Sequence, residues 1–247
     1  MKIGVLVVGK VADELLDRYP EFPPFFDDLM APAAPEARLQ DFNVLRGEEP
    51  TDPRACDAWM ITGSAAGVYD PDPWIPRMRD FLVEIRAAGR PVIGVCFGHQ
   101  LMAAAYGGRA ELSDKGWGIG VQSYQVHHRA PWMVGAGEAF SLHAMHRDQV
   151  TAIAADATVL AGNAFCPYAM LAYGDPAAPE AISIQPHPEF ERPFAEELVS
   201  LRTGDGKIPS EVGEPALRSY GQPVQNGLVA RWFASYFGQA MAARRAA

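Results

Sequence analysis

Short, continuous apolar runs that alternate with helix-like segments constrain the fold of this chain more than any other feature of its 247 residues. Three such runs occur, at residues 3–8, 58–62 and 91–95. An uninterrupted apolar run of this length is typical of a parallel strand that is buried on both faces. Residues 74–88 lie between the second and third runs, and their apolar side chains recur on one helical face. The alternation predicts an open α/β sheet flanked by helices.

The middle and the end of the chain predict other structures. Residues 109–127 and 139–184 contain several short strand-like runs, which we interpret as antiparallel excursions and return strands. An apolar stripe from Leu228 to Phe237 predicts a helix that packs on the sheet. Residues 203–225 are rich in Gly, Pro and charge, and predict a long surface loop or lid. No boundary requires a second domain, so we expect one domain over residues 1–247.

Composition excludes several classes of function. The formal net charge is −9, and an acidic surface repels nucleic acid. Three cysteines without Cys-x-x-Cys spacing argue against a disulfide framework and a structural zinc site. No apolar stretch is long enough to cross a membrane, so a cytoplasmic, reducing location is expected. Neither a phosphate-binding glycine loop nor a dinucleotide fingerprint is present, and we expect no cofactor and no metal.

The segment Gly94-Val95-Cys96-Phe97-Gly98-His99-Gln100 carries the strongest chemical signal. A buried strand ends at Val95 and a helix begins within a few residues, so Cys96 lies on a sharp turn between them. Glycines two residues to either side give the clearance that such a turn needs. This is the pattern of a nucleophile elbow with cysteine in place of serine. The helix N-terminus favours a thiolate there and offers N–H groups to an oxyanion.

A second segment, Gln185-Pro186-His187-Pro188-Glu189, follows the last strand-like run. A thiolate nucleophile needs a base, and the base needs a group that orients it. His187 supplies the imidazole, the two prolines stiffen the turn, and Glu189 can accept a hydrogen bond from one ring nitrogen. Both segments lie at the carboxyl ends of strands, where open α/β sheets place their sites. The sequence therefore predicts a catalytic triad of Cys96, His187 and Glu189.

Together these two segments resemble the class I (triad-type) glutamine amidotransferase family over about residues 1–192, with residues 193–247 as a C-terminal loop-and-helix extension. Ile61-Thr62-Gly63-Ser64 is similar to the family's glycine-rich oxyanion loop, and Met145-His146-Arg147-Asp148 is similar to its Ser-His-Gly-Asp-type loop. With Asp72-Pro73-Trp74 and Lys115-Gly116-Trp117-Gly118, these segments resemble a stand-alone branch. That branch is similar to the amidotransferase domain of GMP synthase and includes γ-glutamyl peptidases.

The resemblance implies an open, mostly parallel twisted sheet in a flavodoxin-like three-layer arrangement with a small antiparallel excursion. It implies that Cys96 attacks a γ-glutamyl amide, that His187 protonates the leaving ammonia or amine, and that water releases glutamate from a thioester. Further site residues follow from the matched motifs: Ser64 and Phe97 as oxyanion N–H donors, and Gly63, Gln100, His146, Arg147 and Asp148 as substrate-binding residues. The implied partners are a small γ-glutamyl substrate and, for some members, a separate synthase or acceptor chain.

Several alternatives stay open at this stage. The chain can be a glutaminase subunit that is active only with a synthase chain, a poly-γ-glutamate or DJ-1-like cysteine hydrolase, or a regulatory module. Phe97 after the cysteine argues against the DJ-1-like class, which usually has histidine there. His143 and His146 are weakly spaced for a metal, and we expect none. Cys56 and Cys166 have no motif around them and are interpreted as structural.

Overall fold

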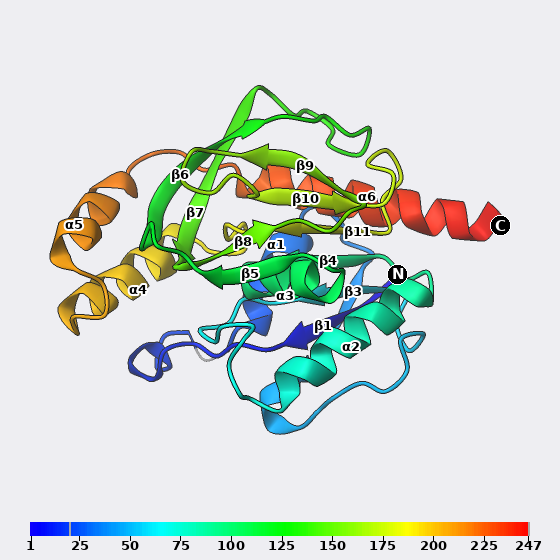
Figure 1. The fold of residues 1–247 in the computed structure, drawn as a ribbon, viewed down its shortest axis with the longest axis horizontal. Helices are drawn as coiled ribbons and strands as arrows, with labels where there is room; N and C mark the ends of the chain where they lie inside the picture. The colour runs from blue at the N-terminus through cyan, green and yellow to red at the C-terminus, as the bar shows by residue number, and fades with distance from the viewer. Residues whose placement is uncertain (20, 247) are drawn as a thin grey trace.

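The computed structural model describes residues 1–19 and 21–246, which form two sheets with flanking helices (Figure 1). The strands are β1 (Lys2–Val7), β2 (Arg38–Asn43), β3 (Ala58–Ile61), β4 (Val92–Val95), β5 (Arg109–Leu112), β6 (Gly118–Val126), β7 (Ala139–His146), β8 (Asp148–Ala152), β9 (Ala157–Gly162), β10 (Met170–Tyr173) and β11 (Ala181–Ile184). The helices are α1 (Pro23–Met30), α2 (Trp74–Ala87), α3 (Phe97–Ala105), α4 (Arg192–Gly204), α5 (Ser210–Ser219) and α6 (Asn226–Ala246), with short 3-10 turns η1 (Asp13–Leu15) and η2 (Val44–Arg46).

The larger sheet runs in the order β2-β1-β3-β4-β11-β10-β9-β6-β7 within the described residues. Its first five strands are parallel neighbours, and the apolar runs expected from the sequence form β1, β3 and β4 at its centre. These strands are almost wholly buried, as expected for a parallel sheet covered on both faces. The open α/β sheet predicted from the sequence is therefore confirmed.

The antiparallel part extends the same sheet through β10, β9, β6 and β7. A separate antiparallel pair, β5 and β8, lies beside α3. The strand-like runs at 109–127 and 139–184 thus form the antiparallel excursion that the sequence predicts. One strand was not anticipated: β2 has no apolar run, because it is the edge strand and its side chains are mostly exposed or half-buried.

Alternation along the central strands creates two cores, one on each face of the sheet. Along β1, Ile3 and Val5 pack into a core with α1 and α6, whereas Leu6 packs into a core with α2 and α3. The apolar stripe of α6 packs in the first core, where Trp232 and Phe233 are wholly buried and Leu228, at its start, is half-buried. The three-layer arrangement follows directly from this division of side chains (Figure 1).

Residues 203–225 do not form the long loop or lid expected from their composition. Helix α4 continues to Gly204 and α5 occupies Ser210–Ser219, so two helices lie together at one end of the molecule (Figure 1). The Gly213 that suggested a loop serves helix packing instead, because a Cβ atom there would overlap the side chain of Thr203. Helix α6, at 21 residues, is not apolar enough to cross a membrane, and neither is any other helix of the described chain.

Candidate active site

Cys96 occupies the sharp turn between β4 and α3. The strand ends at Val95, the helix begins at Phe97, and Cys96 has φ 52° and ψ −103°. Within the described residues, no other non-glycine residue has a positive φ. The turn is held on both sides, because the Cys96 N–H donates to the Ile184 carbonyl at 2.9 Å and the Gln100 N–H donates to the Cys96 carbonyl at 3.1 Å. Such a strained cysteine at a helix start is typical of a nucleophile.

The two glycines that flank Cys96 permit this turn by close backbone contact. A Cβ atom on Gly94 would lie 2.6 Å from the carbonyl of Gly98. A Cβ atom on Gly98 would lie 2.5 Å from the carbonyl oxygen of Ile61 on the neighbouring strand. No side chain fits at either position without displacing backbone. The elbow therefore requires glycine at both positions.

Strand pairing brings the second predicted segment to the elbow. Strands β4 and β11 are parallel, with Val95 opposite Ile184, so the residues that follow each strand emerge at the same edge of the sheet. His187 and Glu189 follow β11 by three and five residues. The Nδ1–H of His187 donates to Oε1 of Glu189 at 2.7 Å, and both side chains are buried. Nε2 of His187 is thereby left to face Cys96.

The electrostatics of this pair favour a protonated imidazole. Burial disfavours the charged ring, but the Glu189 carboxylate and the Cys96 sulfur, both hydrogen-bonded to it, outweigh burial and raise the pKa of His187 to about 10. On its other face, the ring stacks on Phe190 with 4.0 Å between centroids and 8° between planes. The arrangement holds His187 as an imidazolium beside Cys96, ready to donate a proton.

The loop after β3 closes over these groups. A Cβ atom on Gly63 would lie 3.1 Å from Cε1 of His187 and 3.5 Å from Cβ of Cys96, so the loop touches both side chains. The loop is tied to the elbow, because the Gly98 N–H donates to the Thr62 carbonyl at 3.2 Å. Gly63 thus lies against both the cysteine and the histidine, where a side chain would press on the imidazole.

Ser64 and Phe97, the expected oxyanion donors, flank Cys96 from two elements. Ser64 follows Gly63 and lines the same cavity as Cys96. Phe97 is the first residue of α3, so its N–H has no partner inside the helix. Its ring points away into the core, where it packs on Trp74 with 5.3 Å between centroids. Phe97 is wholly buried and does not line the cavity, so its role as an oxyanion donor stays a prediction that rests on the position of its N–H at the start of α3.

The four remaining expected residues lie together beside Cys96. The Gln100 amide donates to the Asp148 carbonyl at 2.9 Å, and the Nδ1–H of His146 donates to the same oxygen at 3.1 Å. Burial lowers the pKa of His146 to about 4, so its ring is neutral. The guanidinium of Arg147 lies 5.6 Å from the centroid of the Trp117 ring. These residues form a polar surface with one cation, Arg147, at its edge.

His143 and His146 do not form a metal site together. Both lie on β7 three residues apart, so they point to opposite faces of the strand. The Nδ1–H of His143 donates to the carbonyl of Phe190 at 2.9 Å. This hydrogen bond holds the backbone that follows Glu189. No cluster of three or more His, Cys, Asp or Glu side chains suited to a metal occurs in residues 1–19 and 21–246.

Two polar residues of the site escaped the sequence analysis. The Tyr69 hydroxyl hydrogen-bonds Asp148, and burial together with that carboxylate raises the pKa of Tyr69 to about 12. Tyr69 lies in a loop far along the chain from Asp148, and no local motif marks it. The second is Gln185, whose Nε2 donates to the Cys96 sulfur at 3.5 Å while its Oε1 accepts from Gln100 at 3.2 Å. Gln185 lies two residues before His187 in the sequence, and this position is a signal that could have identified it as a site residue.

A cavity of about 890 Å³ joins these groups and extends beyond them. One side of it, the polar side, is formed by Tyr69, Gln100, Trp117, His146, Arg147 and Asp148. Another part of the lining, the aromatic wall, is formed by Phe22, Phe190, Phe194 and Leu198. Cys96, Gly63, Ser64 and His187 also line the cavity, whereas Glu189 is buried behind His187. The sequence analysis missed the aromatic wall.

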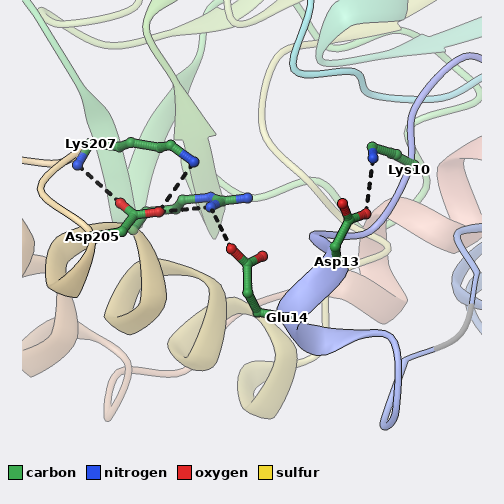
Figure 2. Close-up of polar contacts among 6 residues, drawn as sticks. Lys10, Asp13, Glu14, Asp205 and Lys207 are labelled. Carbon is green, nitrogen blue, oxygen red and sulfur yellow. Dashed lines mark hydrogen bonds and ion pairs between the residues drawn. The ribbon is translucent and has the colours of Figure 1, made fainter.

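Beyond the aromatic wall, the cavity has a charged rim. Figure 2 shows Lys10 paired with Asp13, and Asp205 paired with Lys207 while Glu14 faces them. Arg202 pairs with Asp205 at 2.8 Å at the end of α4, and its ion pair with Glu14 at 3.8 Å joins α4 to η1. The five labelled side chains of Figure 2 and Arg202 include three cations and three anions.

Comparison with known proteins places this site in a family. The family model "Glutamine amidotransferase class-I" matches residues 43–199. Gamma-glutamyl peptidase 5 of Arabidopsis thaliana is 26% identical over 165 residues, which is 64% of this chain and 64% of that protein. The GMP synthase (glutamine-hydrolyzing) of Thermomicrobium roseum is 33% identical over 131 residues, which is 53% of this chain and only 23% of that protein.

Solved structures agree on the fold. A glutamine amidotransferase of Thermotoga maritima superposes with a TM-score of 0.74 at 15% identity, covering 96% of this chain and 97% of that one. A glutamine amido transferase from Methylobacillus flagellatus gives a TM-score of 0.72 at 19% identity, covering 98% and 94%. At these identities the likeness shows the fold alone. The family model covers more than half of the chain, and the chain therefore belongs to the class-I glutamine amidotransferase family.

Proposed function

We propose that this chain hydrolyses γ-glutamyl amides through a thioester on Cys96. The observation that carries the proposal is the meeting of a strained cysteine at a helix start with a buried histidine whose pKa is raised to about 10. A thiolate beside an imidazolium has both the nucleophile and the acid that amide cleavage needs. Membership in an enzyme family that includes γ-glutamyl peptidases supports the same chemistry.

The proposed reaction has two halves. The Cys96 thiolate attacks the γ-carbonyl carbon, and the oxyanion receives the N–H groups of Ser64 and Phe97. His187 gives its proton to the leaving nitrogen as the C–N bond breaks, which leaves a γ-glutamyl thioester. Water then attacks the thioester and gives a proton to His187, and glutamate and the Cys96 thiolate are released. Glu189 holds the ring in position throughout.

The polar side of the cavity is suited to the α-amino and α-carboxylate groups of the γ-glutamyl part. Asp148 and Tyr69 offer a carboxylate and a hydroxyl to an ammonium group. Arg147 offers a guanidinium to a carboxylate, and it is the one cation of the polar side as defined above. We assign the recognition of the γ-glutamyl part to this side, with Gln100 holding the Asp148 segment in place.

The test is release of glutamate by the purified chain alone. We expect hydrolysis of at least one γ-glutamyl peptide or amine without a partner, and none by Cys96→Ala. Hydrolysis of glutamine only in the presence of a synthase chain would instead favour a partner-dependent subunit, as the similarity to GMP synthase allows. Retention of activity in Cys96→Ala would contradict the proposed mechanism.

An electrophilic glutamine analogue gives an independent test of the nucleophile. We expect it to label Cys96 and neither of the other two cysteines. Burial raises the pKa of the Cys56 thiol, and burial raises that of Cys166 to about 12, so both are poor nucleophiles. Labelling of Cys56 or Cys166, read by peptide mass spectrometry, would contradict the assignment.

A further inference from the structure

The cavity around Cys96 is larger than a γ-glutamyl group requires. Its volume of about 890 Å³ lies in the range that holds drug-sized ligands, roughly 300–1,000 Å³. The polar side accounts for the recognition of the γ-glutamyl part. Space therefore remains for a second part of the substrate, and the aromatic wall is the apolar part of the lining that can receive it.

The position of His187 shows which part of a substrate enters that space. The acid that protonates a leaving group must stand on the side of the leaving nitrogen. His187 is that acid, and the face of its ring stacks on Phe190 of the aromatic wall. Phe190 in turn contacts Phe194 with 4.8 Å between ring centroids. A substituent on the leaving nitrogen would therefore lie against aromatic carbon.

Helix α4 builds much of this surface. Phe194, Leu198 and Arg202 are spaced four residues apart, so they lie along one face of the helix, and all three line the cavity. Leu198 is only half-buried, which leaves part of its side chain open to an occupant. On this face of α4, Phe194 contacts Phe190, which stacks on His187, and Arg202 lies at the rim.

The cations of the rim are already paired with carboxylates, so the rim does not favour an anionic leaving group. Lys10 pairs with Asp13 at 2.9 Å, and Lys207 pairs with Asp205 at 3.2 Å. Arg202, the most buried of the three cations, is already hydrogen-bonded to Asp205 at 2.8 Å. A carboxylate on the leaving group would have to displace these acids, so charge complementarity favours a neutral apolar group.

We infer that the aromatic wall is a leaving-group subsite. The substrates of this chain are then γ-glutamyl amides whose amine part carries an aromatic ring and no carboxylate. This inference rests on the proposed function and deepens it. The ring packs on Leu198, which is half-buried, and on those parts of Phe190 and Phe194 that line the cavity, and the freed amine leaves past the rim.

The test compares γ-glutamyl-phenethylamide with γ-glutamyl-ethylamide, which differ only by the phenyl ring. We expect kcat/KM to be about tenfold or more higher for the phenethylamide, because burial of the ring stabilises its complex. γ-Glutamyl-phenylalanine, which adds a carboxylate, is expected to be the poorer of the two aromatic substrates. Equal rates for the first pair, or a preference for γ-glutamyl-phenylalanine, would overturn the inference.

Matched variants on α4 locate the effect. Leu198→Asn is close in size and places an amide in the subsite, so the preference for the phenethylamide is expected to fall severalfold. Leu201→Asn is the control, because Leu201 is half-buried on the same helix and does not line the cavity. The control is expected to keep the parent ratio, and an equal fall in both variants would contradict the assignment.

Binding separates this inference from the proposed function. With Cys96→Ala protein, calorimetry measures the dissociation constants of the two intact amides. Tighter binding of the phenethylamide by about tenfold supports the subsite even if the wild-type chain hydrolyses neither amide, in which case the proposed function fails alone. If the two amides bind equally and the wild-type chain hydrolyses both, the proposed function is supported and the leaving-group subsite is contradicted.

Discussion

Gly9 lies so close to Gly63 that a Cβ atom on Gly9 would overlap the carbonyl oxygen of Gly63. The same atom would lie 3.2 Å from the α-carbon of Ser64. The loop after β1 thus sets the position of the loop after β3, although neither residue is close to the other in sequence. The position of the Ser64 N–H, which we assign to the oxyanion, thus depends on a glycine that does not line the cavity.

Replacement of Gly9 by alanine is therefore expected to lower kcat about 10- to 100-fold, because a displaced oxyanion donor loses part of its effect. The control is Gly221→Ala, where nothing lies within 4 Å of the added methyl group. Steady-state hydrolysis of one γ-glutamyl amide by both variants measures the difference. Parent activity in Gly9→Ala would show that the β3 loop adjusts freely.

The Glu189 carboxylate is expected to be necessary for the charge on His187. In Glu189→Gln the opposing charge is lost while the shape is kept, so the pKa of His187 falls and kcat drops about 100-fold or more. The pH dependence of kcat is the readout, and its limb that belongs to His187 should move to lower pH. An unchanged pH profile would contradict the role given to Glu189.

Gln185 is expected to support the Cys96 thiolate through its Nε2 donor. Gln185→Leu removes this hydrogen bond, and a hydrogen bond to a charged group contributes enough to change a rate about tenfold or more. The rate of Cys96 alkylation by iodoacetamide at neutral pH measures the effect. Gln122→Leu serves as the control, because its amide bonds the Ile119 carbonyl outside the cavity. Equal alkylation rates in both variants would argue against a role for Gln185.

Stability is expected to fall on both sides of neutral pH. Burial lowers the pKa of His99 to about 3 and that of His146 to about 4, so the folded protein keeps these rings neutral. Below pH 6.5 the unfolded chain binds more protons at these sites, and the free energy of unfolding decreases down to about pH 3. His187 acts in the opposite sense: its contribution is complete below pH 6.5 and is lost as pH rises to about 10.

Urea unfolding between pH 4 and pH 9 measures this profile. In His99→Asn, which retains a polar group near Ser183, the acid limb is expected to become shallower. His128→Asn is the matched control, because His128 is exposed. A profile as steep in His99→Asn as in the parent would show that another group causes the loss of stability in acid.

The site residues predicted from the sequence are those whose geometry is local. Cys96 lies between two glycines, and His187 and Glu189 lie in one proline-rich turn, so each could be found from a few neighbours. The aromatic wall could not, because Phe22 and Phe194 meet only through tertiary packing at 6.5 Å between ring centroids. The interpretation of residues 203–225 as a loop was wrong for a related reason. Gly213 and Pro215 of this segment lie inside α5, where packing on α4 overrides their low helix propensity.

The backbone of Cys96, at φ 52° and ψ −103°, has a consequence for how this protein can change over time. A side chain in that conformation costs about 1–3 kcal/mol, and glycine would relieve it. The substitution Cys96→Gly would thus remove the nucleophile and stabilise the fold at the same time. Under the proposed function, a descendant freed from selection for hydrolysis would gain stability by placing glycine here and would lose its nucleophile with the same change.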